Sequence, residues 1–305
     1  TAEWRVTDSM RLAEIAVRHF GSPVVVKADG LCGGKGVSVE KTMYGALNAA
    51  HDCLETKIFG EAGKRIIFER CLEGTEASVM ALCDGVRHMM LPTARDYKRA
   101  LNGDLGENTG GMGAYSPATL LTERDVNYVS TMIIAPTLSE MRRRGAPFRG
   151  ILYAGVMKTK KGIYLLEFNV RWGDPETQVV LPRIATDVLD LMWKSSEYGG
   201  LRDVTHVPTF AHAAVCKVLV SNGYPNAFEI GKQIHGIESA RNHALVFHAG
   251  TRQAGDKIMT DGGRGLNVVG LGETIEDARA SVEKASACVH YKNKFARSDI
   301  ALNVE

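Results

Sequence analysis

The stretch SPVVVKADGLCGGKGVSVE, residues 22–40, constrains the fold most, because it sets a glycine-rich loop between two strand-like segments. Glycines stand at positions 30, 33, 34 and 36, and Val37, Ser38 and Val39 then alternate like a strand. Glycine has no Cβ, so backbone N–H groups in such a loop can approach an anion closely. The pattern predicts a mobile hairpin flap over a triphosphate, and a flexible tight turn without a ligand is the alternative.

Two common phosphate loops are excluded by the residues that follow the glycines. A Walker A loop needs a hydroxyl residue after its lysine, but Gly36 follows Lys35. A dinucleotide-binding fingerprint opens a helix with GxGxxG, whereas GLCGGKG has other spacing and precedes a strand. Protein kinases do place a glycine flap between strands, but their catalytic-loop and DFG signatures are missing here.

Composition limits the class of protein. The chain has 305 residues, of which 45% are hydrophobic and 24% charged, so we expect a globular protein of two or more domains. A formal net charge of +2 does not predict a nucleic-acid partner. Six cysteines without CxxC spacing favour buried thiols in a reducing compartment, and neither a signal peptide nor an apolar run of membrane length is found. We therefore expect a cytoplasmic protein that does not bind a membrane.

Hydrophobic periodicity and turn residues predict alternating helices and strands. We expect residues 92–119 to be mostly loop, which makes them a functional candidate. A helix is expected to start with Asp174 as its cap and Pro175 at its first helical position and to run to about residue 196. The other expected elements are helices at 8–20, 42–54, 126–141 (interrupted at Pro136) and 274–290, a strand at 65–72, and hairpins turning at 84–85 and 160–162.

A second candidate site lies in the strand-like segment IYLLEFNVR. Glu167, Asn169 and Arg171 are spaced two residues apart, so a strand presents them on one face. Two neighbouring oxygen donors suit Mg²⁺, which takes one or two protein ligands together with nucleotide phosphates, and a guanidinium stabilises a developing negative charge. The alternative is the polar, solvated face of a half-buried strand.

Two further segments suit a small charged substrate. Asp96, Lys98 and Arg99 precede the glycine-rich run ENTGGMGAYSP at 107–117, which offers charges of both signs and backbone amides. The expected helix start at Asp174–Glu176 offers free N–H groups. An ordinary surface turn and an ordinary helix start are the alternatives.

Taken together, the motifs resemble one family over nearly the whole chain. They are VVVKADGLCGGKGV, FERCLEGTEAS, DYKR, NTGGMGAYSP, LYAGVM, LEFNVRWGDPETQ, VFHAGT and DGGRGLNVVGLG. In this order they are similar to the phosphoribosylamine–glycine ligases, also called glycinamide ribonucleotide synthetases, of the ATP-grasp superfamily. The chain departs from the family's usual residues at Cys32 and Gly33 (usually alanines), Tyr97 (usually histidine) and Glu107 (usually proline). A histidine proton shuttle at position 97 is therefore not expected.

The resemblance implies an α+β, ATP-grasp fold in which two α+β lobes clasp ATP, with a small C-terminal α+β domain. We expect the ATP-grasp domain at residues 1–195, divided near residue 75 into a small lobe with the flap and a large lobe, and the C-terminal domain at 205–305. The family opens with a nucleotide-fold domain of about a hundred residues, which this chain lacks. The chain is therefore expected to be a fragment, or part of a longer polypeptide that carries other purine-pathway domains.

The resemblance also assigns residues to ligands. Lys27 and Arg171 are implied in catalysis, and Glu167 and Asn169 as ligands of Mg²⁺ or Mn²⁺. The implied ATP-binding residues are Lys27, Gly33, Gly34, Lys35, Gly36, Glu69, Leu72 and Glu76. The implied substrate-binding residues are Asp96, Lys98, Arg99, Asn108, Thr109, Gly110, Gly111, Met112, Gly113, Asp174, Pro175, Glu176 and Thr177.

The activity implied is the ATP-dependent joining of glycine to 5-phosphoribosylamine through a glycyl phosphate, giving glycinamide ribonucleotide, ADP and phosphate in purine biosynthesis. ATP, glycine and phosphoribosylamine are the expected small-molecule partners. Two alternatives remain open: another ATP-grasp carboxylate ligase, and an ATP-binding fragment without turnover.

Overall fold

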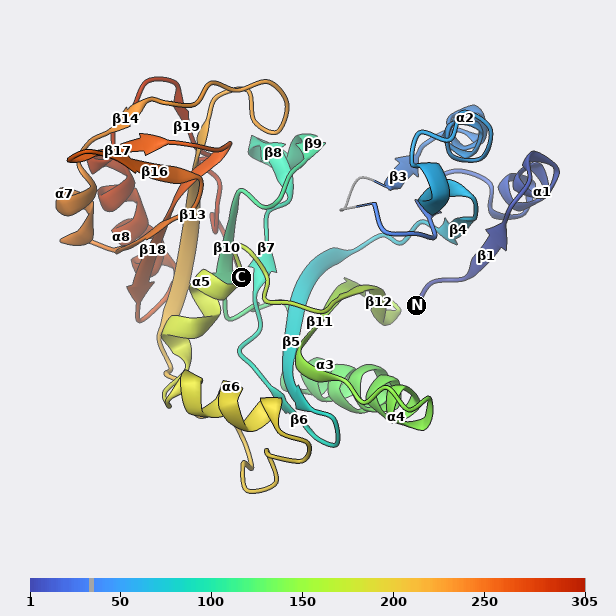
Figure 1. Cartoon of the computed structure of the whole chain (residues 1–305), viewed down its shortest axis with the longest axis horizontal. Coiled ribbons are helices and arrows are strands. Elements are labelled where there is room, and N and C mark those ends of the chain that lie inside the picture. The colour runs from blue at the N-terminus through green and yellow to red at the C-terminus, as the bar shows by residue number, and fades with distance from the viewer. Residues whose placement is uncertain (33–35, 305) are drawn as a thin grey trace. The chain divides into compact units, whose positions relative to one another are not determined.

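The structure of the chain, a computed structural model, describes residues 1–32 and 36–304. It contains two compact units. Unit 1 comprises Thr1–Gly74 and Tyr164–Leu166, and unit 2 comprises Thr75–Ile163 and Glu167–Glu305. Both contain helices packed on antiparallel sheets, as expected for the α+β class (Figure 1).

Unit 1 is a four-stranded sheet with two helices packed on it. Its elements are β1 (Trp4–Thr7), α1 (Met10–Phe20), β2 (Val24–Ala28), β3 (Val37–Glu40), α2 (Met43–Leu54), the 3₁₀ turn η1 (Gly60–Gly63) and β4 (Ile66–Arg70). The sheet order is β1-β4-β2-β3, and every pair is antiparallel (Figure 1). Val17 and Ala50 of the helices share one buried core with Val24 and Phe68 of the sheet. The predicted order of helix, strand, glycine loop, strand and helix is therefore present.

The first half of unit 2 is built on a sheet in the order β12-β11-β5-β6. Its strands are β5 (Thr75–Asp84), β6 (His88–Met90), β11 (Arg149–Thr159) and β12 (Gly162–Asn169), and its helices are α3 (Glu123–Tyr128), the π-helical η3 (Val129–Ile134) and α4 (Ala135–Arg143). Both predicted hairpins are present, because β5 pairs with β6 and β12 follows β11 in the sheet. The irregularity predicted at Pro136 is the π-helical stretch that precedes it, since proline cannot donate the usual backbone bond.

The second half of unit 2 is a larger sheet with α8 packed on it. Its order is β15-β18-β13-β10-β7, and β19 also pairs with β13. The strands and helices are β7 (Arg95–Asp96), β10 (Gly113–Ser116), β13 (Ala213–Ser221), α7 (Ile237–Arg241), β15 (Leu245–His248), β18 (Arg264–Gly272), α8 (Ile275–Cys288) and β19 (Lys294–Phe295). A small sheet contains β14 (Gln233–Ile234), β17 (Lys257–Thr260) and β16 (Thr251–Ala254). β13 is buried along its whole length.

The expectation that residues 92–119 are mostly loop is wrong. Besides β7 and β10, this segment contains β8 (Arg99–Leu101), the 3₁₀ turn η2 (Asn102–Asp104) and β9 (Leu105–Asn108), and β8 pairs with β9. All four residues of β10 are buried between β7 and β13. The sequence of β10, GAYS, has little strand propensity, so pairing with a strand a hundred residues later makes it a strand.

The expected helix start at Asp174 is also wrong. The helix α5 (Thr177–Val180) has Glu176 at its N-cap position and is only four residues long. A 3₁₀ turn, η4 (Leu181–Arg183), follows, and α6 (Val188–Ser196) then begins anew with Asp187 as its cap. Pro182 lies where one continuous helix would need its backbone N–H, and the Asp187 carboxylate accepts hydrogen bonds from two N–H groups of the second helix.

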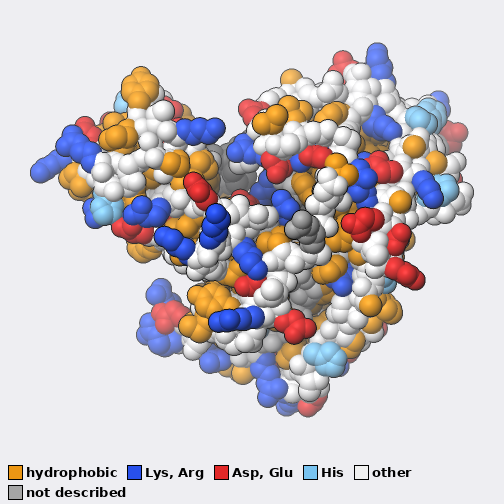
Figure 2. Space-filling model, turned by 180° about the vertical axis from the view of Figure 1, so that it is seen from behind, with side chains coloured by type: hydrophobic (Ala, Val, Ile, Leu, Met, Phe, Trp, Pro, Cys, Tyr) orange, Lys and Arg blue, Asp and Glu red, His pale blue; other side chains and the backbone are white. Residues whose placement is uncertain are grey.

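The surface carries mixed charge. On the face shown in Figure 2, lysine and arginine side chains are interspersed with aspartate and glutamate, in keeping with the formal net charge of +2. None of the helices described here is both long enough and apolar enough to cross a membrane.

Candidate functional site

In unit 1, two of the predicted ATP-binding side chains are direct neighbours. Lys27 of β2 and Glu69 of β4 lie on adjacent strands and form an ion pair. The Lys27 ammonium group also donates to the Leu166 carbonyl at 3.3 Å. The Glu69 carboxylate, which is 7% exposed, accepts a further hydrogen bond from the Thr1 hydroxyl at 3.0 Å. These contacts fix the ammonium group of Lys27 at the end of β2, where the glycine loop begins.

The predicted flap is described only at its ends. Gly33, Gly34 and Lys35 lie outside the described residues. At the start of the loop, Gly30 donates to the Ala62 carbonyl at 3.0 Å, and a Cβ on Gly30 would come within 2.4 Å of the Ala62 backbone. Gly36 closes the loop, with its carbonyl accepting from Ala28 at 2.8 Å. That the flap and β12 converge on one triphosphate therefore stays a prediction.

The remaining predicted ATP-binding residues follow β4. Leu72 is half-buried in the segment after the strand. Glu76, near the start of β5, is in unit 2, where its carboxylate pairs with the Lys98 ammonium group at 2.6 Å. Glu76, predicted to face the ribose, thus also holds a predicted substrate-binding residue.

The strand predicted to bind metal, β12, and the residues after it place the polar side chains of Glu167, Asn169 and Arg171 next to one another, as their two-residue spacing predicted. The Asn169 amide donates to the Glu167 carboxylate at 3.3 Å, and the Arg171 guanidinium donates to the Asn169 side-chain oxygen at 3.2 Å. Arg171 lies two residues beyond the end of β12 and also bonds the Trp172 carbonyl at 2.8 Å. The three side chains therefore form one hydrogen-bonded row, with Glu167 and Arg171 exposed.

This donor set fits a magnesium ion. Ligands of an octahedral Mg²⁺ at about 2.05 Å from the ion lie about 2.9 Å from each other, and the ends of the Glu167 and Asn169 side chains are 3.3 Å apart. A half-turn of the Asn169 amide exchanges the positions of its oxygen and nitrogen. It places two oxygens side by side for a metal, and the amide then gives up its present hydrogen bonds to Glu167 and Arg171. Among the described residues, no three histidine, cysteine, aspartate or glutamate side chains gather as a metal site, so further ligands would come from phosphates and water.

A buried acidic cluster in unit 2 contains several predicted substrate-binding residues. The Glu176 carboxylate is 3% exposed and accepts hydrogen bonds from the Ser78 hydroxyl at 3.0 Å and the Tyr153 hydroxyl at 2.5 Å. Nearby, the Asp96 Oδ1 atom is buried and has no hydrogen-bond partner among the described residues. Burial raises the pKa of Asp96 well above its usual range, and the Glu176 carboxylate raises it further.

Lys98 connects this cluster to the metal strand. Burial would lower the pKa of the Lys98 ammonium group, but the neighbouring carboxylates, Glu76 foremost, together raise it and the net shift is upward. Asp96 and Glu167 add to the rise. Lys98 is therefore held as a cation among carboxylates, between the predicted metal ligand and the predicted substrate residues.

The glycine-rich turn at 108–113 packs directly on the cluster. Gly111 has φ +109°, and a Cβ there would lie 2.3 Å from Pro175 and 2.8 Å from the Asp96 Oδ1 atom. The turn is closed by Thr109, whose N–H and hydroxyl both donate to the Lys98 carbonyl, at 2.7 and 2.9 Å. Only glycine permits this close approach of backbone and carboxylate.

Four of the predicted substrate residues are buried in the interior of unit 2. Met112 is fully buried in the core, with its N–H bonded to Tyr97 and its carbonyl to Val218. A Cβ on Gly113 would lie 2.6 Å from the Cys216 carbonyl. Pro175 and Glu176 are buried beneath the turn. That these four residues contact substrate stays a prediction.

Sequence reasoning missed two residues, Arg264 at the start of β18 and Tyr224 in the turn after β13. The Arg264 guanidinium bonds the Gly110 carbonyl at 2.5 Å, the Asp174 carbonyl at 2.9 Å and the Asp174 carboxylate at 2.9 Å. The Tyr224 hydroxyl accepts from the Gly110 N–H at 3.0 Å. The only sequence signal was an arginine among glycines in DGGRG. Both residues hold the glycine-rich turn in place, although Tyr224 and Arg264 come 114 and 154 residues after Gly110 in the chain.

Comparisons with known proteins identify the family. The family described as "Phosphoribosylglycinamide synthetase, ATP-grasp (A) domain" matches residues 1–177, and its "C domain" matches 214–303. The chain belongs to this family. The family membership predicted from the motifs, and with it the ATP-grasp fold, is confirmed.

Relatives of known name agree with the family. A phosphoribosylamine–glycine ligase of Agrobacterium fabrum is 43% identical over 93% of this chain and 66% of its own length, and that of Rhizobium meliloti is 41% identical over 97% and 69%. The crystal structure of a phosphoribosylamine–glycine ligase from Thermotoga maritima superposes with a TM-score of 0.88 at 33% identity, over 98% of this chain and 74% of that one. The chain thus spans about two thirds of the length of the curated relatives.

Proposed function

We propose that this chain supplies the ATP-grasp and C domains of a ligase that joins glycine to 5-phosphoribosylamine. A carboxylate is a poor electrophile, because its negative charge repels an amine. Transfer of the γ-phosphoryl group of ATP to glycine would give glycyl phosphate and ADP, and the amine would then attack the acyl carbon and release phosphate. Catalysis of such steps depends mostly on positioning and on charge stabilisation.

The observation that carries the proposal is the hydrogen-bonded row of Glu167, Asn169 and Arg171 at the end of β12. We propose that Glu167 and Asn169 hold Mg²⁺ or Mn²⁺, which when bound to the ATP phosphates would neutralise part of their charge. Arg171, in reach of the same group, would steady the acyl phosphate. Lys27, with Glu69 as its partner, would contact ATP phosphate.

In unit 1, the flap glycines, Lys35, Glu69 and Leu72 are proposed to bind ATP. In unit 2, Glu76 is proposed to contact the ribose. The proposed substrate-binding residues are Asp96, Lys98, Arg99, Asn108, Thr109, Gly110, Gly111, Met112, Gly113, Asp174, Pro175, Glu176 and Thr177. Arg264 and Tyr224 add support through their bonds to Asp174 and Gly110.

We also infer that the protein works in the cytoplasm. All six cysteines are described and are free thiols, three of them buried. Burial raises the pKa of the Cys83 thiol to about 12, which leaves it protonated and unreactive at neutral pH. Free thiols of this kind suit a reducing compartment.

The decisive test is Glu167→Gln, which keeps the shape of the side chain but removes its charge. Magnesium-dependent ADP formation with glycine and phosphoribosylamine should fall at least about a hundredfold, the size of loss seen when one charge-stabilising group is removed. Because the chain spans two thirds of its relatives, the assay should be run with and without a separately expressed N-terminal domain of a relative. Glu197→Gln, at an exposed position after α6, is the matched control and should keep its activity.

Three results would contradict parts of the proposal. Undiminished turnover by Glu167→Gln would refute the metal assignment. ADP release that depends on a different carboxylate would indicate another ATP-grasp ligase. ATP binding without phosphate release, even with the N-terminal domain supplied, would indicate an ATP-binding fragment without turnover.

A further inference from the structure

The strands β8 and β9 form a hairpin that carries proposed substrate residues at its base. Lys98 and Thr109 close the base through the two hydrogen bonds to the Lys98 carbonyl. The tip turns through Gly103 and Asp104, both in the left-handed region, with φ values of 69° and 54°. Such a turn is accessible to glycine and tolerated by aspartate, but it is not favoured by the chain alone.

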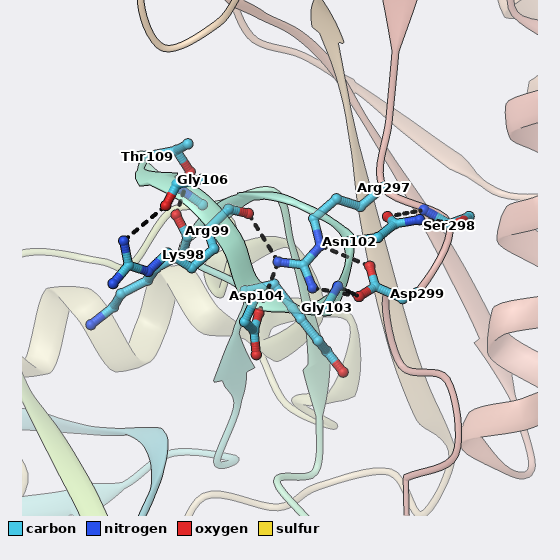
Figure 3. A network of polar contacts seen from close by, with 12 residues as sticks. Lys98, Arg99, Asn102, Gly103, Asp104, Gly106, Thr109, Arg297, Ser298 and Asp299 are labelled. Carbon is cyan, nitrogen blue, oxygen red and sulfur yellow. Dashed lines mark hydrogen bonds and ion pairs between the residues drawn. The ribbon is translucent and has the colours of Figure 1, made fainter.

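A segment nearly two hundred residues later in the chain holds this tip (Figure 3). The Arg297 guanidinium donates to the Asp104 carboxylate and to the Arg99 carbonyl, both at 2.9 Å. It also forms two bonds to the Asp299 carboxylate, at 2.8 and 2.7 Å. Arg297 is 1% exposed, so these bonds are shielded from water.

The neighbours of Arg297 bond to the same tip. The Asn102 side chain donates to the Ser298 hydroxyl at 2.7 Å and accepts from the Ser298 N–H at 3.1 Å. The Gly103 N–H donates to the Asp299 carboxylate at 2.8 Å. Every residue of the turn η2 therefore has a partner in the segment 297–299.

The same guanidinium also reaches the residue that precedes the hairpin. It lies 5.0 Å from the centre of the Tyr97 ring, in cation–π geometry. The Tyr97 hydroxyl accepts from the Ala301 N–H at 3.0 Å, and the Tyr97 carbonyl accepts from Met112 at 2.8 Å. Arg297 is thus linked to both ends of the segment 97–112, which contains Lys98 and the glycine-rich turn.

We propose that Arg297 is a positioning residue, which fixes the β8–β9 hairpin so that Lys98 and the turn at 109–111 keep their place beside Asp96 and Asp174. Arg297 does not itself reach these groups; in Figure 3 the Lys98 side chain extends away from the guanidinium. A buried guanidinium with a bidentate carboxylate partner and two further acceptors is rigid, because moving the hairpin would leave a buried charge short of partners. The effect of Arg297 on substrate binding rests on the proposed function, whereas its effect on the rigidity of the hairpin does not.

The test compares Arg297→Met with Arg297→Lys and with Asp104→Asn. In Arg297→Met, amide hydrogen exchange should become at least about tenfold faster within residues 98–111, while the sheet of unit 1 keeps its protection. In the reconstituted enzyme, KM for phosphoribosylamine should rise about tenfold, and kcat and KM for ATP should stay within about twofold of wild type. Arg297→Lys keeps the positive charge but not the planar set of guanidinium donors. Its exchange rates and its KM for phosphoribosylamine should therefore lie between those of wild type and Arg297→Met.

Asp104→Asn covers the case in which Arg297→Met does not fold. The Asp104 side chain is 55% exposed, and its replacement leaves the Arg297–Asp299 pair intact. It should speed exchange in the same segment to a smaller extent. The matched control is Arg183→Met, which removes another buried guanidinium of unit 2, one bonded to Ser116 and His212 and not to the hairpin.

The outcomes separate positioning from general stability. Unchanged exchange at 98–111 in both Arg297→Met and Asp104→Asn would overturn the proposal, as would an equal change across all of unit 2. An identical rise in KM in Arg183→Met would show that loss of stability alone is responsible. If no variant and no wild-type preparation turns over, the proposed function fails, but the exchange measurement still decides the role of Arg297.

Discussion

Asp96 shows how neighbours set the charge of a single side chain. Its Oδ1 atom is buried without a partner among the described residues, close to the Glu176 carboxylate and to the Gly111 backbone. An ionised carboxylate is costly there, because burial and the Glu176 charge disfavour it and its Oδ1 atom accepts no hydrogen bond from the described residues. Asp96 is one of the residues that we propose to bind substrate, and a substrate amine or ammonium group would supply the missing donor.

The pH dependence of stability should report this cost. Because the pKa of Asp96 is raised in the folded protein, the folded state keeps its proton to a higher pH than the unfolded chain, for which the pKa is 3.8. Ionisation of Asp96 therefore lowers the free energy of unfolding progressively as the pH rises above about 4. The side chain of Asp96→Asn cannot ionise. Its free energy of unfolding, measured by urea denaturation, should therefore increase relative to that of wild type as the pH rises from about 4 to about 7.

Two results bear on this prediction. Asp256→Asn, at an exposed turn, is the control for the loss of one carboxylate. A stability difference between wild type and Asp96→Asn that is independent of pH would show that Asp96 ionises as easily in the folded protein as in the unfolded chain.

At the scale of elements, local patterns predicted some structures and missed others. The hairpin of β11 and β12 and the helix α8 follow from alternation and periodicity within their own residues. The strand β10 was missed, because its burial comes from β13, a hundred residues later. The short helix α5 was overestimated, because Pro182 interrupts a pattern that periodicity alone would continue.

The helix α8 offers a direct test of such local control. Its first turn has a capping box, in which the Thr274 hydroxyl accepts from the Asp277 N–H at 3.1 Å and the Asp277 carboxylate accepts from Thr274. Thr274→Ala should lower the free energy of unfolding by about 1 kcal/mol, the usual value of an N-cap. Urea denaturation followed by circular dichroism would measure the change.

Thr274→Ser is the control, since serine caps as well as threonine and should keep most of the stability. Equal stability of Thr274→Ala and wild type would mean that the packing of α8 on β13 and β18, rather than its cap, determines where the helix begins.

At the scale of the whole molecule, the candidate site in unit 2 depends on residues far apart in sequence. The motifs predicted Glu167, Asn169, Lys98 and the glycine-rich turn, because each is a local pattern. They did not predict Arg264, since a single arginine carries no local signal and its partner Asp174 is 90 residues away. They also could not show that Gly111, Met112 and Gly113 are all buried.

The sheet of β13 and β10 crosses the position at which we expected a domain boundary, between residues 195 and 205. The boundary stays a prediction, and deletion tests it. A chain of residues 1–204 lacks β13 and exposes the fully buried β10, so we expect it to aggregate. A chain of residues 75–305 keeps every strand of that sheet and should remain soluble.

Size-exclusion chromatography and circular dichroism would distinguish these outcomes. A soluble 1–204 chain with cooperative unfolding would show that the C-terminal domain is dispensable for folding. Aggregation of both chains would show that unit 2 needs unit 1.

The bond between Arg297 and the hairpin tip also has a consequence for the making of the protein. Arg99 and Asp104 leave the ribosome 198 and 193 residues before Arg297. At ordinary rates of translation this interval lasts roughly 10 to 40 seconds. Throughout it the tip lacks its guanidinium partner, so the nascent chain exposes the unpaired hairpin to chaperones and proteases until Arg297 has been synthesised.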